Sequence, residues 1–215
     1  MELNKYIEHT LLKQDATRSE LIKLLDEARD YKFLGVCVNP INVKFAKQYL
    51  KETDIKIVTV IGFPLGQNTL ETKVLETIDA VKNGADEIDM VLNTGKLKDS
   101  EYDYIVEEIS SVKKACQGNS LKVILETDLL NQEEIKLASE LCAKAGADFV
   151  KTSTGFVKNG VGAKVEDVKL MYETVKNYGL GVKASGGVRD KETAIAMIKA
   201  GATRIGTSSG VKICS

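Results

Sequence analysis

The sequence is poor in several residue types, and each shortage argues against a class of protein. It holds one histidine, His9, and four widely spaced cysteines with no CxxC pair. Because a catalytic zinc site needs several histidine, cysteine or carboxylate ligands gathered in space, we expect no metal site. There are two prolines and no low-complexity stretch, so nothing indicates a linker or a domain boundary.

Long apolar runs and an excess of charge of one sign are also missing. No apolar run approaches the roughly 18 residues of a membrane-spanning helix, and the N-terminus is unlike a signal peptide. We therefore expect a reduced, cytoplasmic protein that does not bind membranes. The 30 basic and 31 acidic residues nearly cancel, which gives no electrostatic reason to expect nucleic acid as a partner.

The sequence does have a regular alternation of short β-branched runs and longer amphipathic stretches. Strands are predicted at 6–12, 34–39, 56–63, 86–93, 121–127, 148–154, 181–187 and 203–209. Helices are predicted between them, for example at 17–31, 67–83, 131–145 and 190–200. Glycine follows three helical runs just before a strand, in "VKNGADEIDMV", "AKAGADFVK" and "IKAGATRIG", where it supplies a left-handed helix C-cap.

This repeated strand–helix unit predicts an α/β protein, a (β/α)8 TIM barrel that forms a single domain over residues 1–215. The chain length and the 43% hydrophobic content suit one sizeable core. A doubly wound open sheet is the alternative, because the pattern alone does not fix the order of the strands. The lack of a GxGxxG motif after the first strand disfavours that alternative.

Polar side chains inside the apolar strands are the candidate catalytic residues, because the C-terminal ends of barrel strands carry the chemistry. They are Asp89, Lys122, Lys151 and Lys183. Lys151 and Lys183 each follow an apolar residue and precede a turn of small residues. Lys122 stands at the start of its strand, so its long stem either reaches solvent or brings the ammonium to the site.

Two lysines close together indicate Schiff-base chemistry. A nearby like charge and desolvation both lower the pKa of an amine, and a neutral amine attacks carbonyl carbons. Asp89 has two readings that stay open here. It either relays protons or only neutralises a buried lysine.

Glycine-rich turns follow the last two predicted strands, "SGGVRD" at 185–190 and "GTSSG" at 206–210. The N–H groups of such turns can approach an anion, and the loops after strands 7 and 8 of barrels often hold phosphate. Arg189 either adds a charge there or lies on the helix surface. The glycine-rich loop at 154–164 follows the Lys151 strand and is placed to cover a substrate.

Taken together, these motifs resemble the deoxyribose-phosphate aldolase family. The resemblance rests on "GADFVKTSTGF", "VKASGGVR" and "ADEIDMVLN", with "EHTLLK", "GVCVNP", "IGFPLG" and "GTSSG" extending it over residues 6–210. It implies a class I aldolase, a lyase, on a (β/α)8 barrel. That enzyme reversibly cleaves 2-deoxy-D-ribose 5-phosphate to acetaldehyde and D-glyceraldehyde 3-phosphate in deoxyribonucleotide catabolism, without a cofactor.

The resemblance also implies roles for individual residues. Lys151 corresponds to the Schiff-base lysine, Lys183 to the lysine that perturbs it, and Asp89 to the proton-relay acid. The positions expected to contact the substrate or its phosphate are Thr10, Cys37, Lys122, Thr154, Gly155, Gly186, Gly187, Ser208 and Ser209, with Cys37 non-catalytic. The expected partners are a phosphorylated sugar and an aldehyde, and barrels of this kind often self-associate as dimers or tetramers.

The sequence departs from the family's pattern in two places. Glu8 stands where the family commonly has an aspartate before the His-Thr pair, so a contact to a substrate hydroxyl is expected to be longer or absent. The chain also ends at "VKICS", without the longer tail whose terminal tyrosine assists proton transfer in some members.

Three other functions remain compatible with these residues. One is a transaldolase-like enzyme that uses the same lysine on a different phosphorylated sugar. Another is a phosphosugar isomerase barrel with acid/base carboxylates and no covalent lysine. The last is a catalytically silent binder of a phosphorylated metabolite, in which Lys151 only forms a salt bridge with the ligand.

Overall fold

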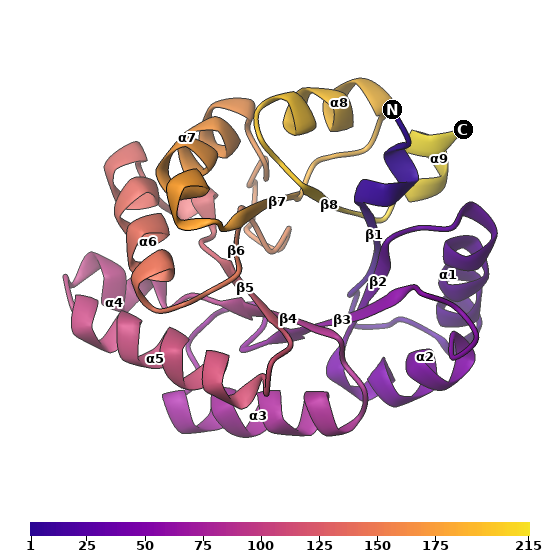
Figure 1. Ribbon diagram of the computed structural model, residues 1–215, viewed down its shortest axis with the longest axis horizontal. Helices are drawn as coiled ribbons and strands as arrows, with labels where there is room; N and C mark the ends of the chain where they lie inside the picture. Colours follow the sequence, from indigo (N-terminus) through magenta and orange to yellow (C-terminus); the bar gives the residue numbers. More distant parts are fainter.

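Eight parallel strands close into a barrel in this computed structural model, which describes residues 1–215, and helices surround the barrel (Figure 1). The strands are β1 (Ile7–Leu11), β2 (Gly35–Val38), β3 (Lys56–Ile61), β4 (Glu87–Val91), β5 (Ser120–Ile124), β6 (Phe149–Lys151), β7 (Gly181–Ser185) and β8 (Arg204–Thr207). They pair in sequence order, and β8 pairs with β1. The predicted (β/α)8 barrel is confirmed, and the open-sheet alternative is wrong.

Helices connect the strands on the outside of the barrel (Figure 1). They are α1 (Arg18–Tyr31), α2 (Val43–Tyr49), α3 (Leu70–Lys82), α4 (Thr94–Lys98), α5 (Tyr102–Ala115), α6 (Gln132–Lys144), α7 (Val165–Val175), α8 (Lys191–Lys199) and α9 (Gly210–Cys214). Short 3-10 turns add η1 (Leu3–Tyr6), η2 (Pro40–Asn42), η3 (Thr127–Leu129) and η4 (Lys176–Tyr178). None of the helices has the length and apolarity that crossing a bilayer requires.

Local sequence signals set the ends of several helices. Thr17 and Glu20 form a capping box at the start of α1, and Asn131 and Glu134 form another at the start of α6. The glycines that follow α3, α6 and α8 have φ angles of 102°, 82° and 116°, in the left-handed region that glycine tolerates. The predicted glycine turns between helix and strand are therefore present.

The predicted strand at 148–154 is too long, because β6 ends at Lys151. The N–H of Thr152 still donates to the carbonyl oxygen of Lys183 at 3.1 Å, and its hydroxyl donates to the carbonyl oxygen of Ser185 at 2.9 Å. The β-branched threonines after Lys151 raise the strand propensity of the segment. Here, however, they form the turn that opens the end of the barrel, and tertiary hydrogen bonds outweigh the local preference.

The hydrophobic core lies between the barrel and its helices, and the barrel interior is largely polar. Alternate strand residues such as Ile88 and Met90 pack against helix residues such as Ile105 and Ile109 in a cluster of 45 buried residues. Asp89 lies between Ile88 and Met90 and faces the other side, because successive side chains of a strand alternate. The fold thus directs the polar residues of the strands to one enclosed space.

Candidate active site

The predicted catalytic residues come from neighbouring strands and face the barrel interior together. Asp89 on β4 is in register with Lys122 on β5, and Lys151 on β6 is in register with Lys183 on β7. Register partners on adjacent strands share a face of the sheet. Since β4 and β7 are not neighbours, the contact between Asp89 and Lys183 crosses the inside of the barrel.

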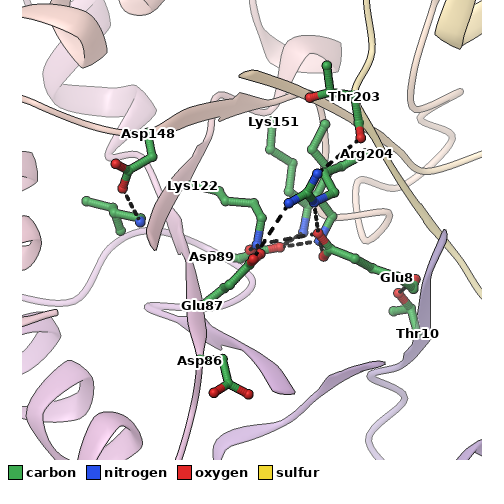
Figure 2. A network of polar contacts seen from close by, with 12 residues as sticks. Glu8, Thr10, Asp86, Glu87, Asp89, Lys122, Asp148, Lys151, Thr203 and Arg204 are labelled. Atoms are coloured by element: carbon green, nitrogen blue, oxygen red, sulfur yellow. Dashed lines mark hydrogen bonds and ion pairs between the residues drawn. The ribbon is translucent and has the colours of Figure 1, made fainter. Parts of the chain in front are cut away.

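Asp89 is the shared counter-ion of three lysines. Its Oδ2 atom lies 2.7 Å from the Nζ of Lys151 and 2.6 Å from the Nζ of Lys183. Its Oδ1 atom lies 3.0 Å from the Nζ of Lys122. Figure 2 shows the Asp89 carboxylate beside the ends of the Lys122 and Lys151 side chains. One carboxylate therefore links the candidate nucleophile to two further ammonium groups.

Glu8 on β1 belongs to the same buried network. Its Oε2 atom accepts a hydrogen bond from Lys183, and its Oε1 atom lies 3.5 Å from the Nζ of Lys122. The side chain is fully buried and does not line the cavity described below. The residue that departs from the family's pattern thus acts on Lys183 and Lys122 within the barrel.

The two register-paired lysines have opposite pKa shifts. Burial lowers the pKa of Lys151, and the neighbouring Lys183 ammonium acts in the same direction against the Asp89 carboxylate. Burial also lowers the pKa of Lys183, but the Asp89 and Glu8 carboxylates outweigh it and raise that pKa above its usual value. Lys151 is therefore the lysine disposed to be neutral, and Lys183 stays protonated.

The two carboxylates of the network are held in the charged form. Burial raises the pKa of Asp89, but the three lysines outweigh it, and the pKa lies well below its usual value. For Glu8 burial acts in the same way, and Lys122 and Lys183 bring its pKa below the usual value. A charged Asp89 can accept a proton, which a proton relay requires.

A cavity of about 730 Å³ opens at the C-terminal ends of β1, β6, β7 and β8. Of the three lysines around Asp89, only Lys151 lines this cavity. Its side chain is 3% exposed, whereas Lys122 and Lys183 are fully buried. Access therefore selects Lys151 as the amine that a substrate can reach. The predicted residues that line the cavity are Thr10, Lys151, Thr154, Gly155, Gly186, Gly187 and Ser208.

The glycine turns at the cavity present free backbone donors. The N–H groups of Gly186, Gly187 and Ser208 donate no hydrogen bond within the protein. Gly187 has a φ of 75°, and a Cβ atom there would lie 2.5 Å from the carbonyl oxygen of Val161. No other residue fits that position without a shift of the backbone. Arg189, for which two placements were open, lines the same cavity.

Of the two placements expected for Lys122, the structure has the one inside the barrel, but without contact to the cavity. Its side chain neither reaches solvent nor lines the cavity. Instead, its Nζ atom lies 2.5 Å from Glu87 Oε2 and 3.0 Å from Asp89 Oδ1, and these carboxylates keep the ammonium inside the barrel. The pattern of the strand gave no sign of Glu87 as its partner, because the pairing depends on which strands are neighbours.

Cys37 and Ser209 also do not line the cavity. Cys37 is buried in a small apolar cluster inside the barrel on β2 and β3, and burial raises the pKa of its thiol. Ser209 stands at the start of α9, where its N–H donates to the Thr207 hydroxyl oxygen at 2.9 Å. Both residues stand near the site, but their contacts are with the protein.

Two residues that support the site were missed from the sequence. Glu126 follows β5 in the left-handed conformation, with a φ of 61°, and its carboxylate accepts hydrogen bonds from the N–H and hydroxyl of Thr154. Gly206 on β8 leaves room for Lys183, because a Cβ there would lie 2.9 Å from the Lys183 Cε. A carboxylate at a strand end and a glycine within a strand were the available signals.

Comparisons with known proteins identify the family that the chain resembles over its whole length. A family model described as "DeoC/LacD family aldolase" matches residues 3–215. A deoxyribose-phosphate aldolase of Enterococcus faecalis is 56% identical over 216 residues, which is 100% of this chain and 97% of that protein. The deoxyribose-phosphate aldolase of Staphylococcus carnosus is 58% identical over 213 residues, 99% of this chain and 96% of its own.

Solved structures give the same result. The deoxyribose phosphate aldolase of Aeropyrum pernix, described as a tetramer, superposes with a TM-score of 0.91 at 36% identity, covering 99% of this chain and 89% of that one. An aldolase called QR15 superposes with a TM-score of 0.95 at 44% identity, covering 100% and 95% of the two chains. The similarity extends over the whole barrel.

Proposed function

The chain belongs to the DeoC/LacD aldolase family, and from this membership we propose that it is a class I aldolase acting on 2-deoxy-D-ribose 5-phosphate. It cleaves this sugar reversibly to acetaldehyde and D-glyceraldehyde 3-phosphate. The observation that carries the proposal is the placement of Lys151, a buried lysine with a lowered pKa at the floor of the cavity. The roles of the individual residues that follow are part of the proposal.

Lys151 forms the covalent bond to the substrate. Its neutral amine adds to the aldehyde carbon of the open-chain sugar, and loss of water gives an iminium ion. The iminium draws electrons from the adjacent carbon, so the next C–C bond breaks when the hydroxyl beyond it gives up its proton. D-glyceraldehyde 3-phosphate leaves, and an enamine remains. Protonation of the enamine carbon and addition of water release acetaldehyde and regenerate Lys151.

Asp89 and Lys183 move protons beneath the reacting atoms. Asp89 is charged and accepts hydrogen bonds from both Lys151 and Lys183. A proton released at the reacting centre passes to Asp89 directly or through water. Lys183 donates a proton back to the reacting centre, and Asp89 then reprotonates Lys183 along their hydrogen bond. Lys183 also keeps a positive charge beside Lys151, which favours the neutral amine at the start of each turnover.

The glycine turns hold the phosphate group. The free N–H groups of Gly186, Gly187 and Ser208 face the cavity lined by Lys151, and Arg189 adds a positive charge at its rim. A phosphate held there fixes how far the sugar reaches towards Lys151. Such positioning supplies catalysis by proximity.

Assembly and location complete the proposal. The similar protein of Aeropyrum pernix is described as a tetramer, and we expect a dimer or tetramer here, which light scattering after gel filtration measures. All four cysteines are free, as a reducing compartment favours, and we expect the protein in the cytoplasm.

A coupled assay for D-glyceraldehyde 3-phosphate tests the function directly. The protein is expected to release it from 2-deoxy-D-ribose 5-phosphate, and Lys151→Leu is expected to abolish release. Lys136→Leu, at an exposed lysine on α6, is the matched control and keeps the activity. Three outcomes contradict the proposal: isomerisation without cleavage, transfer of a larger donor than acetaldehyde, or binding without turnover.

A further inference from the structure

A second group of charges lies below Asp89, on the side of the barrel away from the cavity. Glu87 and Arg204 are the first residues of β4 and β8, whereas the cavity opens at the C-terminal ends of the strands. We call these two residues the basal pair. Arg204 Nη2 lies 3.8 Å from Glu87 Oε1, and Arg204 Nε lies 3.6 Å from Glu8 Oε1. Figure 2 shows Arg204, Glu87 and Glu8 converging with Lys122 on Asp89.

The basal pair is connected to the catalytic residues through Lys122. The Nζ of Lys122 lies 2.5 Å from Glu87 and 3.0 Å from Asp89, which contacts Lys151 at 2.7 Å. Phe149 lies beside this group, with the Arg204 guanidinium 5.1 Å and the Lys122 ammonium 5.8 Å from its ring centre. Gly181 leaves room for the ring, since a Cβ there would lie 2.2 Å from a ring carbon.

The charges inside the barrel do not balance when every group is ionised. The interior charge network consists of three carboxylates, Glu8, Glu87 and Asp89, and four cationic side chains, Lys122, Lys151, Lys183 and Arg204. An unbalanced charge in a low-dielectric interior is costly, and the cost is removed when one group loses a proton. Loss of one proton from a lysine balances the network.

The other titratable or charged groups around Lys151 do not correct this imbalance. Inside the barrel, β2 contributes only the thiol of Cys37, and Lys56 on β3 is exposed at the far end without an ion pair. The groups on the cavity side are Lys13, Asp15, Glu126, Asp128, Lys158 and Arg189. Lys13 lies 2.5 Å from Glu20 and 3.7 Å from Asp15, and Asp128 lies 3.9 Å from Lys164. Lys158 and Arg189 are exposed to solvent. Glu126 forms no ion pair with a lysine, and burial raises the pKa of its carboxyl, which favours the neutral form.

Contact with carboxylates decides which side chain gives up the proton. Arg204 cannot deprotonate in a protein. Lys122 lies within 3.5 Å of three carboxylates and Lys183 contacts two, whereas Lys151 contacts only Asp89. Lys151 therefore gains the least from its positive charge. The charge balance and the contacts point to the same amine.

We propose that Glu87 and Arg204 are positioning residues that set the protonation state of Lys151 through the total charge of the barrel interior. Neither residue touches the cavity. Glu87 stabilises the charged form of Lys122, so the proton that the network loses does not come from Lys122. Arg204 supplies the fourth positive charge, so the three carboxylates leave one lysine cation without a balancing negative charge. The proposal rests on the role of Lys151 given above, but the protonation of Lys151 can be measured without turnover.

Removing each member of the basal pair is expected to shift the titration of Lys151 in opposite directions. Glu87→Gln removes a negative charge and lowers the pH at which Lys151 loses its proton. Arg204→Gln removes a positive charge and raises that pH. Each shift is expected to be about half a unit to one unit, and the double variant is expected to return close to the parent. Loss of stability alone does not produce shifts of opposite sign that cancel.

Competitive labelling with trace acetic anhydride across a pH series, with mass spectrometry of the Lys151 peptide, measures this titration in the full-length protein. The pH profile of kcat/KM for cleavage of 2-deoxy-D-ribose 5-phosphate is the second readout. Glu108→Gln is the matched control, because Glu108 is a fully buried carboxylate paired with Lys73 outside the barrel interior. It is expected to cost stability and leave the Lys151 titration unchanged.

Opposite shifts that cancel in the double variant support the proposal. Equal midpoints in all folded variants, or shifts in the same direction, overturn it. If Glu87→Gln does not fold, Arg204→Gln decides alone: an upward shift supports the proposal and an unchanged midpoint overturns it. If the parent cleaves no sugar, the proposed function fails, while the labelling still reports whether the basal pair controls Lys151.

Discussion

Lys151 and Lys183 are register partners on adjacent strands, and both donate a hydrogen bond to the same oxygen, Asp89 Oδ2, at 2.7 and 2.6 Å. Only Lys151 lines the cavity. Lys183 has a second carboxylate, Glu8, which keeps its charge. The two lysines occupy matched positions in the sheet, but their pKa values shift in opposite directions. The reason is that the Glu8 carboxylate contacts Lys183 and not Lys151.

Substituting Lys183 tests this division of roles. Lys183→Met removes the neighbouring positive charge, so the pKa of Lys151 is expected to rise and the acid limb of kcat/KM to move to higher pH. Turnover is expected to fall about 10²–10⁴-fold as the proton donor is lost. Removing one cationic partner of the buried Glu8 is expected to cost about 3–5 kcal/mol of unfolding free energy. A pH profile identical to the parent would contradict the coupling of the two lysines.

Asp89→Asn separates formation of the Schiff base from turnover. The substitution removes the negative charge that opposes deprotonation of Lys151, so this amine is expected to be neutral at lower pH. Adduct formation with acetaldehyde is expected to persist, whereas cleavage of the sugar falls about 10²–10⁴-fold. Single-turnover trapping and steady-state kinetics on the same preparation measure the two steps. An equal fall in the rates of adduct formation and of sugar cleavage would show that Asp89 does not relay protons specifically in the cleavage step.

The placement of Asp89, Lys151 and Lys183 inside the barrel was predictable because each depends on a local pattern. Asp89, Lys151 and Lys183 interrupt apolar strands close to small-residue turns, and the alternation of side chains places them in the barrel. The partners of Lys122 and Glu8 were not predictable in this way. The contacts of Glu8 with Lys122 and Lys183 join strands that are distant in the sequence. The contact of Lys122 with Glu87 joins consecutive strands but depends on the stagger of the closed sheet.

Glu87 shows the limit of the sequence most clearly. It stands two residues before Asp89 on β4 and therefore faces the same interior. Period-two alternation was enough to place it there, but a carboxylate at the start of a strand more often faces solvent. Arg204 is ambiguous for the same reason. Only the closed barrel shows that both join the interior charge network.

The two interior carboxylates of lowered pKa predict how stability depends on pH. Asp89 and Glu8 have lower pKa values in the folded protein than in the unfolded chain. At a pH between the folded and unfolded pKa values, the unfolded chain therefore binds more protons than the folded protein. Their contribution is fully present above about pH 4.5, the upper range of unfolded carboxyl pKa values. It is lost progressively as the pH falls below that point. Denaturant unfolding between pH 3 and 7 measures it.

Glu8→Gln provides the comparison for this prediction. The variant is expected to be less stable than the parent at pH 7 and to lose less stability on acidification. The difference between the two unfolding free energies should therefore narrow below about pH 4.5. A constant difference across the series would contradict the assignment of a lowered pKa to Glu8.

Gly206→Ala tests the space that β8 leaves for Lys183. The new Cβ would lie 2.9 Å from Lys183 Cε and 3.0 Å from Ser185 Cβ, so Lys183 is pushed against its carboxylates. We expect a loss of about 1–3 kcal/mol of stability, as for other overpacked interiors, and a larger proportional fall in kcat than in substrate affinity. Gly95→Ala in α4 is the control, because its Cβ meets nothing closer than 3.4 Å.

Lys151 is proposed to be the amine that bonds to the substrate. Borohydride reduction in the presence of acetaldehyde, followed by mass spectrometry of the lysine-containing peptides, tests it most directly. We expect a two-carbon adduct on Lys151, with Lys122 and Lys183 unmodified. An adduct on Lys183 instead, or no adduct on any lysine, would contradict it.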